Sequence, residues 1–217
     1  MKHILEVDSI QLSFGERKIL SDVYIKCETG RITGLLGRNG QGKSCLMRII
    51  HGSLPAEKSI RFDQVSNLHA YKRPDLLMYL PQFNFIPGQL SLKRIFSDFD
   101  ISFELFIKRF PDFEKFYASR ISSLSGGNRR FIELYIIIKA KSCFTMLDEP
   151  FSHLSPLQVD EVIDLLKEEK RNKGFLITDH MFKHIVEVSD LLYILVDGKT
   201  HLSNKTEDIE LLGYARL

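Results

Sequence analysis

The eight residues GRNGQGKS at positions 37–44 have the types and spacing needed to hold a chain of phosphates. They follow the pattern Gly-x-x-x-x-Gly-Lys-Ser/Thr, in which the glycines let backbone N–H groups approach phosphate oxygens. Lys43 would contact the β- and γ-phosphates of a nucleotide, and the hydroxyl of Ser44 would bind Mg²⁺. The candidate phosphate-binding residues are Gly37, Arg38, Asn39, Gly40, Gln41, Gly42, Lys43, Ser44 and Cys45.

Two carboxylates, Asp148 and Glu149, follow a short apolar run at 144–147. Side chains at the carboxyl ends of parallel strands lie where ligands bind in α/β proteins. Asp148 would hold Mg²⁺, and Glu149 would accept a proton from an attacking water or orient that water. An acidic pair after a strand is, by itself, more typical of a solvated turn. The phosphate loop favours the catalytic interpretation.

A third motif, LSGGN at 124–128, precedes a long helical pattern. A serine and two glycines at the start of a helix form a site for an anion, here Ser125, Gly126 and Gly127. One chain needs a single phosphate loop, so a second such site suggests that phosphates are held from two sides. The alternative is a helix cap with flexible glycines.

The segments around these motifs indicate an α/β protein with a mostly parallel sheet. Apolar runs at 31–36, 144–147, 174–178 and 191–196 predict buried strands, and helical patterns alternate with them. One helix is predicted to begin near Gly42 and to end at Gly52. Three more are predicted at about 128–141, 159–170 and 184–188. Earlier strands are predicted at 4–7, 10–14, 23–27, 59–62 and 78–80.

Residues 83–120 have a helical and aromatic character. Nine of the sixteen phenylalanines lie between Phe83 and Phe116. Phe99, Phe103 and Phe106 recur at helical spacing, which favours a helical unit inserted between strands. Exposed phenylalanines in this unit would form a docking patch, whereas buried ones would fill its core.

Composition limits the possible partners. The 217 residues carry 30 Lys and Arg against 28 Asp and Glu, a net charge of +2, so we expect no nucleic-acid partner. Residues 1–8 carry charges where a signal peptide needs an apolar stretch, and no run approaches about 18 apolar residues, so we expect no direct membrane insertion. Cys27, Cys45 and Cys143 should be reduced and mostly buried, as suits the cytosol.

From about Ile4 to about Asp197, the chain resembles the nucleotide-binding subunit of an ATP-binding cassette (ABC) transporter. The resemblance implies a P-loop NTPase core with a mostly parallel sheet, an N-terminal antiparallel β subdomain and an inserted α-helical subdomain. We therefore expect a single domain over 1–217. Its nucleotide-binding core would comprise 1–82 and 144–217, and its helical subdomain about 83–143.

The same resemblance implies roles for individual residues. In this family two ATP molecules are sandwiched between two cassettes, so Ser125, Gly126 and Gly127 of one subunit would complete the ATP site of the other. Glu149 corresponds to the catalytic base, and His180, in ITDH, to the switch histidine at the γ-phosphate. Gln82, in YLPQ, corresponds to the glutamine that meets Mg²⁺ and water, and Phe14 to the aromatic ring that stacks on adenine. The implied cofactors are ATP and Mg²⁺, with catalytic residues Glu149, His180, Lys43 and Gln82 and metal ligands Ser44, Gln82 and Asp148.

Three positions depart from the family pattern. Asn128 replaces a glutamine, an exchange of amides that should cost little, and Thr145 places a hydroxyl with no evident partner in an apolar strand. Ser155 stands where the family usually has an aspartate that couples the two sites, which leaves coupling and hydrolysis rate open. Hydrolysis itself is expected, since the residues that would carry it out are all present: Lys43, Asp148, Glu149 and His180.

The function that follows is an ATPase motor subunit of a transporter. It would pair with a second cassette, either a copy or a relative, and drive a membrane-spanning subunit at the cytoplasmic face of the membrane through the region near Gln82. One alternative is an ABC-type ATPase acting on ribosomes or DNA, although such relatives tend to have two cassettes, coiled coils or basic extensions. Another is a weakly hydrolysing, nucleotide-dependent regulator. Neither the cargo nor the direction of transport follows from the sequence.

Overall fold

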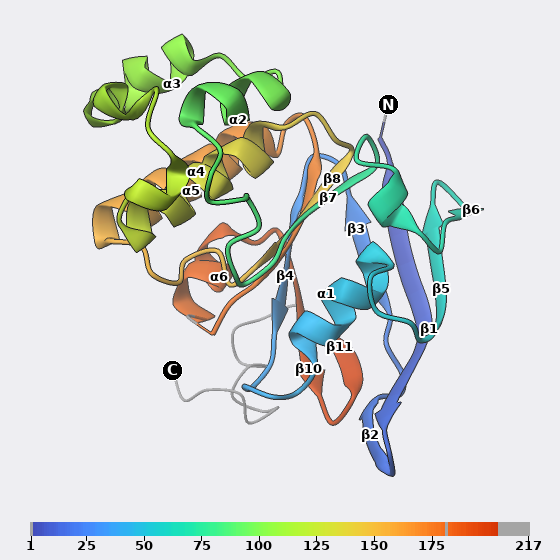
Figure 1. The fold of residues 1–217 in the computed structure, drawn as a ribbon. Coiled ribbons are helices and arrows are strands. Elements are labelled where there is room, and N and C mark those ends of the chain that lie inside the picture. Colours follow the sequence, from blue (N-terminus) through green and yellow to red (C-terminus); the bar gives the residue numbers. More distant parts are fainter. Residues whose placement is uncertain (1, 181, 204–217) are drawn as a thin grey trace.

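The computed structural model describes residues 2–180 and 182–203 of the chain. A six-stranded sheet lies at its centre, with strand order β11-β10-β4-β9-β8-β7 (Figure 1). Every neighbouring pair is parallel except β10 and β11, which are antiparallel. The bounds are β4 Ile32–Leu36, β7 Leu77–Leu80, β8 Phe144–Asp148, β9 Gly174–Thr178, β10 Leu191–Val196 and β11 Lys199–Ser203.

The central strands are buried along their whole length because both faces of the sheet are covered. All five residues of β4, β8 and β9 are buried, as expected for parallel strands between two layers. Leu36 and Leu147 belong to one apolar core and Leu35 and Met146 to another, since successive side chains point to opposite faces. This confirms the α/β fold with a mostly parallel sheet.

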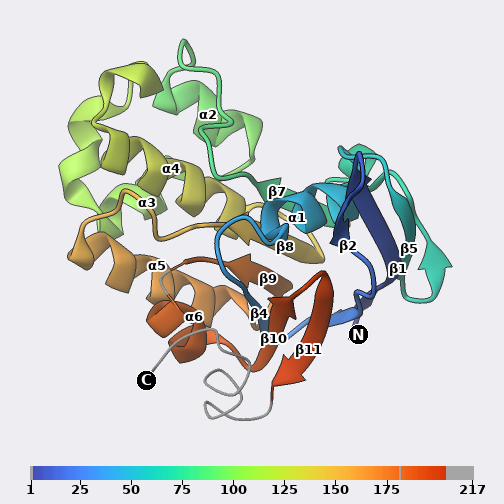
Figure 2. The same ribbon diagram turned by 90° about the horizontal axis from the view of Figure 1, so that it is seen from below.

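The two layers differ in kind. Helices α4 Gly126–Lys139, α5 Pro156–Glu169 and α6 Phe182–Val188 contribute to the first core. Helix α1, Lys43–His51, contributes to the second core together with a separate antiparallel sheet. In Figures 1 and 2, the first group of helices lies to the left of the central strands and the antiparallel sheet to the right, with α1 between the two sheets.

The antiparallel sheet contains one strand that the sequence pattern divided into two. The runs at 4–7 and 10–14 form a single strand, β1 Ile4–Phe14, whose pairing shifts between Asp8 and Gln11 around Ser9, at φ 54°. This irregularity interrupts the alternation of apolar residues. The other strands are β2 Arg17–Leu20, β3 Ile25–Glu28, β5 Glu57–Phe62 and β6 Val65–Ser66, of which β2 and β6 were not predicted.

The helical unit comes between β7 and β8. It contains α2 Leu92–Asp98, α3 Phe103–Arg109 and the 3₁₀ helix η2 Pro111–Phe116, so the predicted helical character begins at 92 rather than 83. A 3₁₀ turn, η3 Ile121–Ser123, precedes α4, and another, η1 Ala70–Lys72, lies outside this unit and precedes β7. The proposed division into core and helical subdomain extends to residue 217, and its part after 203 lies outside the described residues.

Phenylalanines fill the helical unit. The Phe106 side chain is fully buried, with its ring centroid 5.0 Å from that of Phe96 and 4.6 Å from that of Tyr135. Phe99 and Phe103 pack against the same core. The docking-patch interpretation is therefore wrong for these three phenylalanines, because their rings supply the apolar interior of a small subdomain.

Two further expectations concern the cysteines and the membrane. The described cysteines are free; Cys27 is buried, whereas Cys45 and Cys143 are only partly buried. The expectation that they are mostly buried therefore holds fully for Cys27 and in part for Cys45 and Cys143. Of the helices that the structure describes, none has the length and apolar character needed to cross a membrane.

Candidate functional site

The phosphate loop connects β4 to α1. The strand ends at Leu36 and the helix begins at Lys43, so the loop lies at the carboxyl end of a central strand and at a helix N-terminus. Gly40 and Gly42 have φ angles of 80° and 100°, which L side chains rarely adopt. The helix ends at Gly52, as predicted, with φ 89°. Glycine is therefore required by the path of the backbone, and that path exposes N–H groups to an anion.

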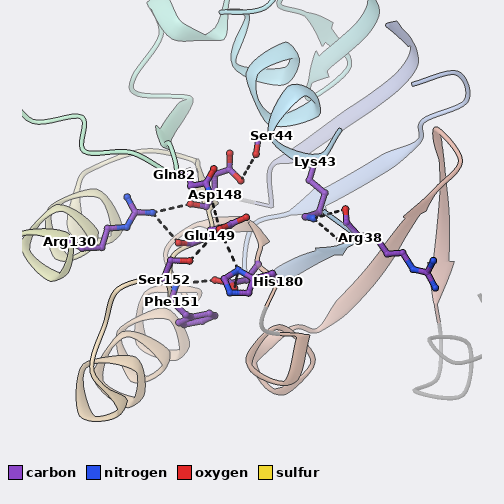
Figure 3. Close-up of polar contacts among 12 residues, drawn as sticks. Arg38, Lys43, Ser44, Gln82, Arg130, Asp148, Glu149, Phe151, Ser152 and His180 are labelled. Atoms are coloured by element: carbon purple, nitrogen blue, oxygen red, sulfur yellow. Dashed lines mark hydrogen bonds and ion pairs between the residues drawn. The ribbon is translucent and has the colours of Figure 1, made fainter. Parts of the chain in front are cut away.

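Lys43 places its ammonium at the base of this loop. Its Nζ donates to the carbonyl oxygens of Gly37 at 2.6 Å and Arg38 at 3.2 Å, and 6% of the residue is exposed (Figure 3). Burial lowers the pKa of Lys43, whereas the charges of Glu149 and Asp148 act in the opposite direction. The result is a positive charge held where phosphate oxygens would approach.

Asp148 meets Ser44 from the adjacent strand end. The Ser44 hydroxyl donates to Oδ1 of Asp148 at 3.2 Å, and the Tyr79 hydroxyl donates to Oδ2 at 3.2 Å. Burial raises the pKa of Asp148, while these two hydrogen bonds act in the opposite direction. One carboxylate and one hydroxyl this close fit Mg²⁺, which prefers oxygen ligands and completes its shell with water and phosphate.

No group of three or more His, Cys, Asp or Glu side chains in the described part of the chain could hold a metal ion by itself. Any Mg²⁺ at this site would therefore depend on nucleotide and water oxygens in addition to Ser44 and Asp148.

Tyr79, which the sequence analysis missed, orients this carboxylate. Replacing Tyr79 by phenylalanine removes one hydrogen bond to Asp148 and keeps the ring. Because groups that orient a metal ligand influence metal affinity by about 10–100-fold, we expect the Mg²⁺ concentration for half-maximal ATP hydrolysis to rise about tenfold. Tyr71→Phe serves as a control, since Tyr71 is exposed. An unchanged Mg²⁺ dependence in Tyr79→Phe would contradict this role.

Glu149 has an unusual backbone and a well-defined set of partners. Its φ is 48°, and its N–H donates to the carbonyl of Thr178 at 2.7 Å. Its Oε2 accepts a hydrogen bond from Gln82 at 2.8 Å and lies 3.4 Å from Nδ1 of His180 (Figure 3). A non-glycine residue at positive φ costs about 1–3 kcal/mol and persists where its surroundings determine it.

A pocket of about 590 Å³ brings most of the predicted residues together. Phe14 lines it and is 55% exposed, so its ring is available to a ligand and does not belong to the core. Arg17 and Ile19 also line it and were missed because strand β2 was not predicted. The complete lining is Phe14, Arg17, Ile19, Asn39, Gly40, Gly42, Lys43, Ser44, Cys45, Gln82, Glu149 and His180.

The LSGGN motif lies elsewhere. Ser125 caps α4 by accepting a hydrogen bond from the backbone N–H of Asn128 at 3.3 Å. Ser125 and Gly127 line a second pocket, of about 850 Å³, whose lining shares no residue with that of the phosphate-loop pocket. A Cβ added to Gly126 would meet nothing within 4 Å, so this glycine faces open space. The chain does not bring this motif to its own phosphate loop.

The three departures from the family pattern each find a structural setting. Ser155 caps α5 in a reciprocal arrangement with Gln158. The Gln158 amide then donates to Oδ1 of Asn128 at 3.0 Å, which ties the start of α4 to the start of α5. Thr145 has a partner after all, because its hydroxyl lies 3.1 Å from Oγ of Ser142.

Replacing Ser155 by alanine should therefore act mainly on stability. Loss of a helix N-cap costs about 1 kcal/mol, which corresponds to a fall in Tm of about 2–4 °C for a chain of this size. Ser155→Asp should retain the wild-type Tm, because aspartate caps helices equally well. Thermal unfolding of both variants checks this expectation, and equal melting temperatures for the two would contradict it.

Similarity to known proteins is extensive. A sequence model of the family described as "ABC transporter" matches residues 20–152. The lipopolysaccharide export system ATP-binding protein LptB of Escherichia coli (strain K12) is 30% identical over 212 residues, which cover 89% of this chain and 87% of that protein. A probable ABC transporter ATP-binding protein of Azorhizobium caulinodans is 30% identical over 221 residues, covering 91% of this chain and 75% of that protein.

Solved structures share the fold. A structure titled as the ATP-binding subunit of an ABC transporter superposes with a TM-score of 0.79 at 20% identity, covering 97% of this chain and 94% of that chain. A nucleotide-free ATP-binding cassette from an ABC transporter has a TM-score of 0.76 at 21% identity, covering 98% and 96%.

Proposed function

Because this chain belongs to the ABC transporter family and is an ATP-hydrolysing subunit of such a transporter, we propose that it acts as one of two cassettes that close on two Mg-ATP molecules. The observation that carries this proposal is the pocket shared by Lys43, Ser44, Gln82, Glu149 and His180. One wall carries the lysine and serine that would bind phosphate, and the other holds a carboxylate beside an amide and an imidazole.

ATP would lie with its adenine on Phe14 and its phosphates on the loop at 37–45. Lys43 would offset charge on the β- and γ-phosphates. Mg²⁺, when bound, would neutralise phosphate charge, with Ser44, Asp148 and Gln82 as its candidate ligands. These assignments rest on the pocket lining and on the hydrogen bond between Ser44 and Asp148.

Glu149 would accept the proton of the attacking water as that water approaches the γ-phosphate in line with the leaving oxygen. Gln82 and His180 lie within 3.4 Å of its carboxylate and would orient the water and contact the γ-phosphate. The products are ADP and phosphate.

A second cassette is needed to complete each site. The LSGGN residues line a different pocket from the phosphate loop, so a single chain supplies two halves that face different ligands. Ser125, Gly126 and Gly127 would contact the γ-phosphate held by the partner. The partner would be a second copy of this chain or a related cassette.

The membrane-spanning part of the transporter would be a separate subunit, and this chain would bind it at the cytoplasmic face of the membrane. Phe83 follows Gln82 directly and is 72% exposed, which supports docking of that subunit near this loop. LptB carries lipopolysaccharide export in its name, but a protein of equal identity is named only as a probable ABC transporter ATP-binding protein. The similarity therefore does not select a cargo, which the membrane subunit would choose.

The two alternatives are less well supported. The relatives are ATP-binding proteins of transporters rather than ribosome- or DNA-associated ATPases. The hypothesis of a weakly hydrolysing regulator was based on the replacement of an aspartate by Ser155. The Ser155 hydroxyl caps α5 as an aspartate would, which weakens this hypothesis. The contacts around Glu149 favour hydrolysis.

The test is ATP hydrolysis by the purified protein over a range of protein concentrations. Turnover per subunit should rise with concentration, because a site is complete only in the dimer. Sedimentation with and without Mg-ATP should report a nucleotide-dependent change in size. Turnover that is independent of concentration, with a monomer at saturating Mg-ATP, would argue against a site shared by two cassettes.

A further inference from the structure

A buried arginine lies behind the catalytic carboxylate. Arg130, on α4, is 3% exposed, and its guanidinium donates to three backbone carbonyls. Nη1 donates to Pro81 at 2.8 Å. Nη2 donates to Asp148 at 3.0 Å and to Glu149 at 3.2 Å (Figure 3). These carbonyls belong to two chain segments that meet beneath the site.

The bonding pattern points to a positioning role rather than to a simple ion pair. Arg130 forms its hydrogen bonds with carbonyl oxygens, and burial lowers its pKa while nearby carboxylates act in the opposite direction. A buried charge is costly unless hydrogen bonds compensate for it. The planar fork of a guanidinium can reach several acceptors at fixed angles, which an ammonium or an apolar side chain cannot do.

One of these contacts fixes the backbone of Glu149. This residue has φ 48°, a conformation that persists only where neighbouring groups impose it. Its N–H donates a hydrogen bond to the carbonyl of Thr178 at 2.7 Å, and its own carbonyl accepts one from Arg130. Both peptide groups of Glu149 are thus held, and the direction of its carboxylate follows from them.

Another contact fixes the approach of Gln82. The carbonyl of Pro81, one residue earlier, accepts a hydrogen bond from Nη1, so the same guanidinium holds both backbones whose side chains meet at 2.8 Å. Arg130 also lies five residues after Ser125 on α4. One side chain therefore joins the LSGGN helix to the two residues placed at the attacking water.

We propose that Arg130 is a positioning residue for hydrolysis: its guanidinium holds Glu149 in the left-handed conformation and sets the backbone before Gln82, so that both side chains face the water. The kinetic part of this inference rests on the proposed function. Arg130 touches neither nucleotide nor water in this scheme, and it acts through the two backbones.

The experiment compares Arg130→Met with Arg129→Met. Arg129, the next residue on α4, donates to the carbonyl of Ile86 at 2.7 Å and pairs with Glu133, but it has no bond to β8 among the described contacts. We expect Arg130→Met to lower kcat for ATP hydrolysis about a hundredfold, the scale of a misplacement of about 1 Å at a reacting group. The KM for ATP should stay within about threefold, because the phosphate loop is unchanged.

Arg129→Met should keep kcat within about threefold of the wild type. Arg130→Lys should recover part of the lost kcat, because it retains the buried charge. The recovery should be incomplete, because an ammonium reaches fewer carbonyls than a guanidinium. Arg130→Lys also replaces Arg130→Met as the test variant if Arg130→Met does not fold. A folded Arg130 variant with wild-type kcat, or a fall in kcat matched by an equal rise in KM, would overturn the inference.

A crystal structure of Arg130→Met, or of Arg130→Lys if the methionine variant does not fold, provides a readout that does not need activity. We expect Glu149 to leave positive φ and its carboxylate to turn away from Gln82. A variant that keeps φ near 48° with the Gln82 contact intact would overturn the proposal. Failure of the wild type to hydrolyse ATP would instead count against the proposed function, and the structural test would still decide the role of Arg130.

Discussion

Replacing Glu149 by glutamine is expected to lower kcat for ATP hydrolysis by about 10²–10⁴-fold, the contribution of a general base, with little change in ATP affinity. Glutamine has the same shape as glutamate and can still accept a hydrogen bond from Gln82, which lies 2.8 Å from Oε2 in the wild type. It cannot take a proton from water. The defect should therefore fall on chemistry rather than on binding.

The same variant should accumulate as an ATP-bound dimer. If hydrolysis and phosphate release open the two cassettes, a subunit that binds ATP without cleaving it stays closed. Sedimentation of Glu149→Gln in saturating Mg-ATP should give twice the monomer mass, and the wild type a mixture. Glu168→Gln is a suitable control, because Glu168 is an exposed glutamate that pairs with Arg109.

Two outcomes would count against this assignment. A kcat equal to that of the wild type would remove Glu149 from the role of base. A variant that stays monomeric at saturating Mg-ATP would separate hydrolysis from dimer opening and leave the LSGGN motif without its role. The backbone of residue 149 should keep its positive φ in this variant. The contacts that hold it, to Thr178 and Arg130, involve no side-chain atom of residue 149.

Local sequence was sufficient where local physics decides the structure. The predicted strands at 174–178 and 191–196 match β9 and β10, because each is a continuous apolar run with a sharp end. The loop at 37–44 was predictable because glycine conformation and phosphate chemistry restrict every fixed position. Helix α1 ends at Gly52, whose φ of 89° terminates it.

Local sequence failed where partners are distant. Strand β2 has one buried residue in four and pairs with the end of β1, so no apolar alternation marks it. Tyr79 meets Asp148, 69 positions away, and Arg130 meets Pro81, 49 positions away. An arginine pair at 129–130 on a helix is typical of a solvated face, and only tertiary packing buries the second arginine.

Replacing Lys43 by alanine should have an effect of a different kind from that of Glu149→Gln. It removes the ammonium that lies 2.6 Å from the Gly37 carbonyl, at the base of the phosphate loop. A hydrogen bond to a charged group is worth about 1.5–3 kcal/mol, so ATP affinity should fall by at least about tenfold and hydrolysis should be lost. Calorimetric titration with ATP measures the first effect and phosphate release the second.

Lys58→Ala controls for loss of a lysine beside α1, because the Lys58 ammonium binds the carbonyl of Ile49 near the other end of that helix. It should bind and hydrolyse ATP like the wild type. Comparing the two site variants then separates binding from chemistry: Lys43→Ala should bind ATP more weakly and lose the dimer and turnover, whereas Glu149→Gln should keep ATP binding and the dimer and lose only turnover. Normal hydrolysis in Lys43→Ala would contradict the phosphate-loop assignment. Equal loss of ATP binding in both variants would mean that Glu149 supports the nucleotide rather than the attacking water.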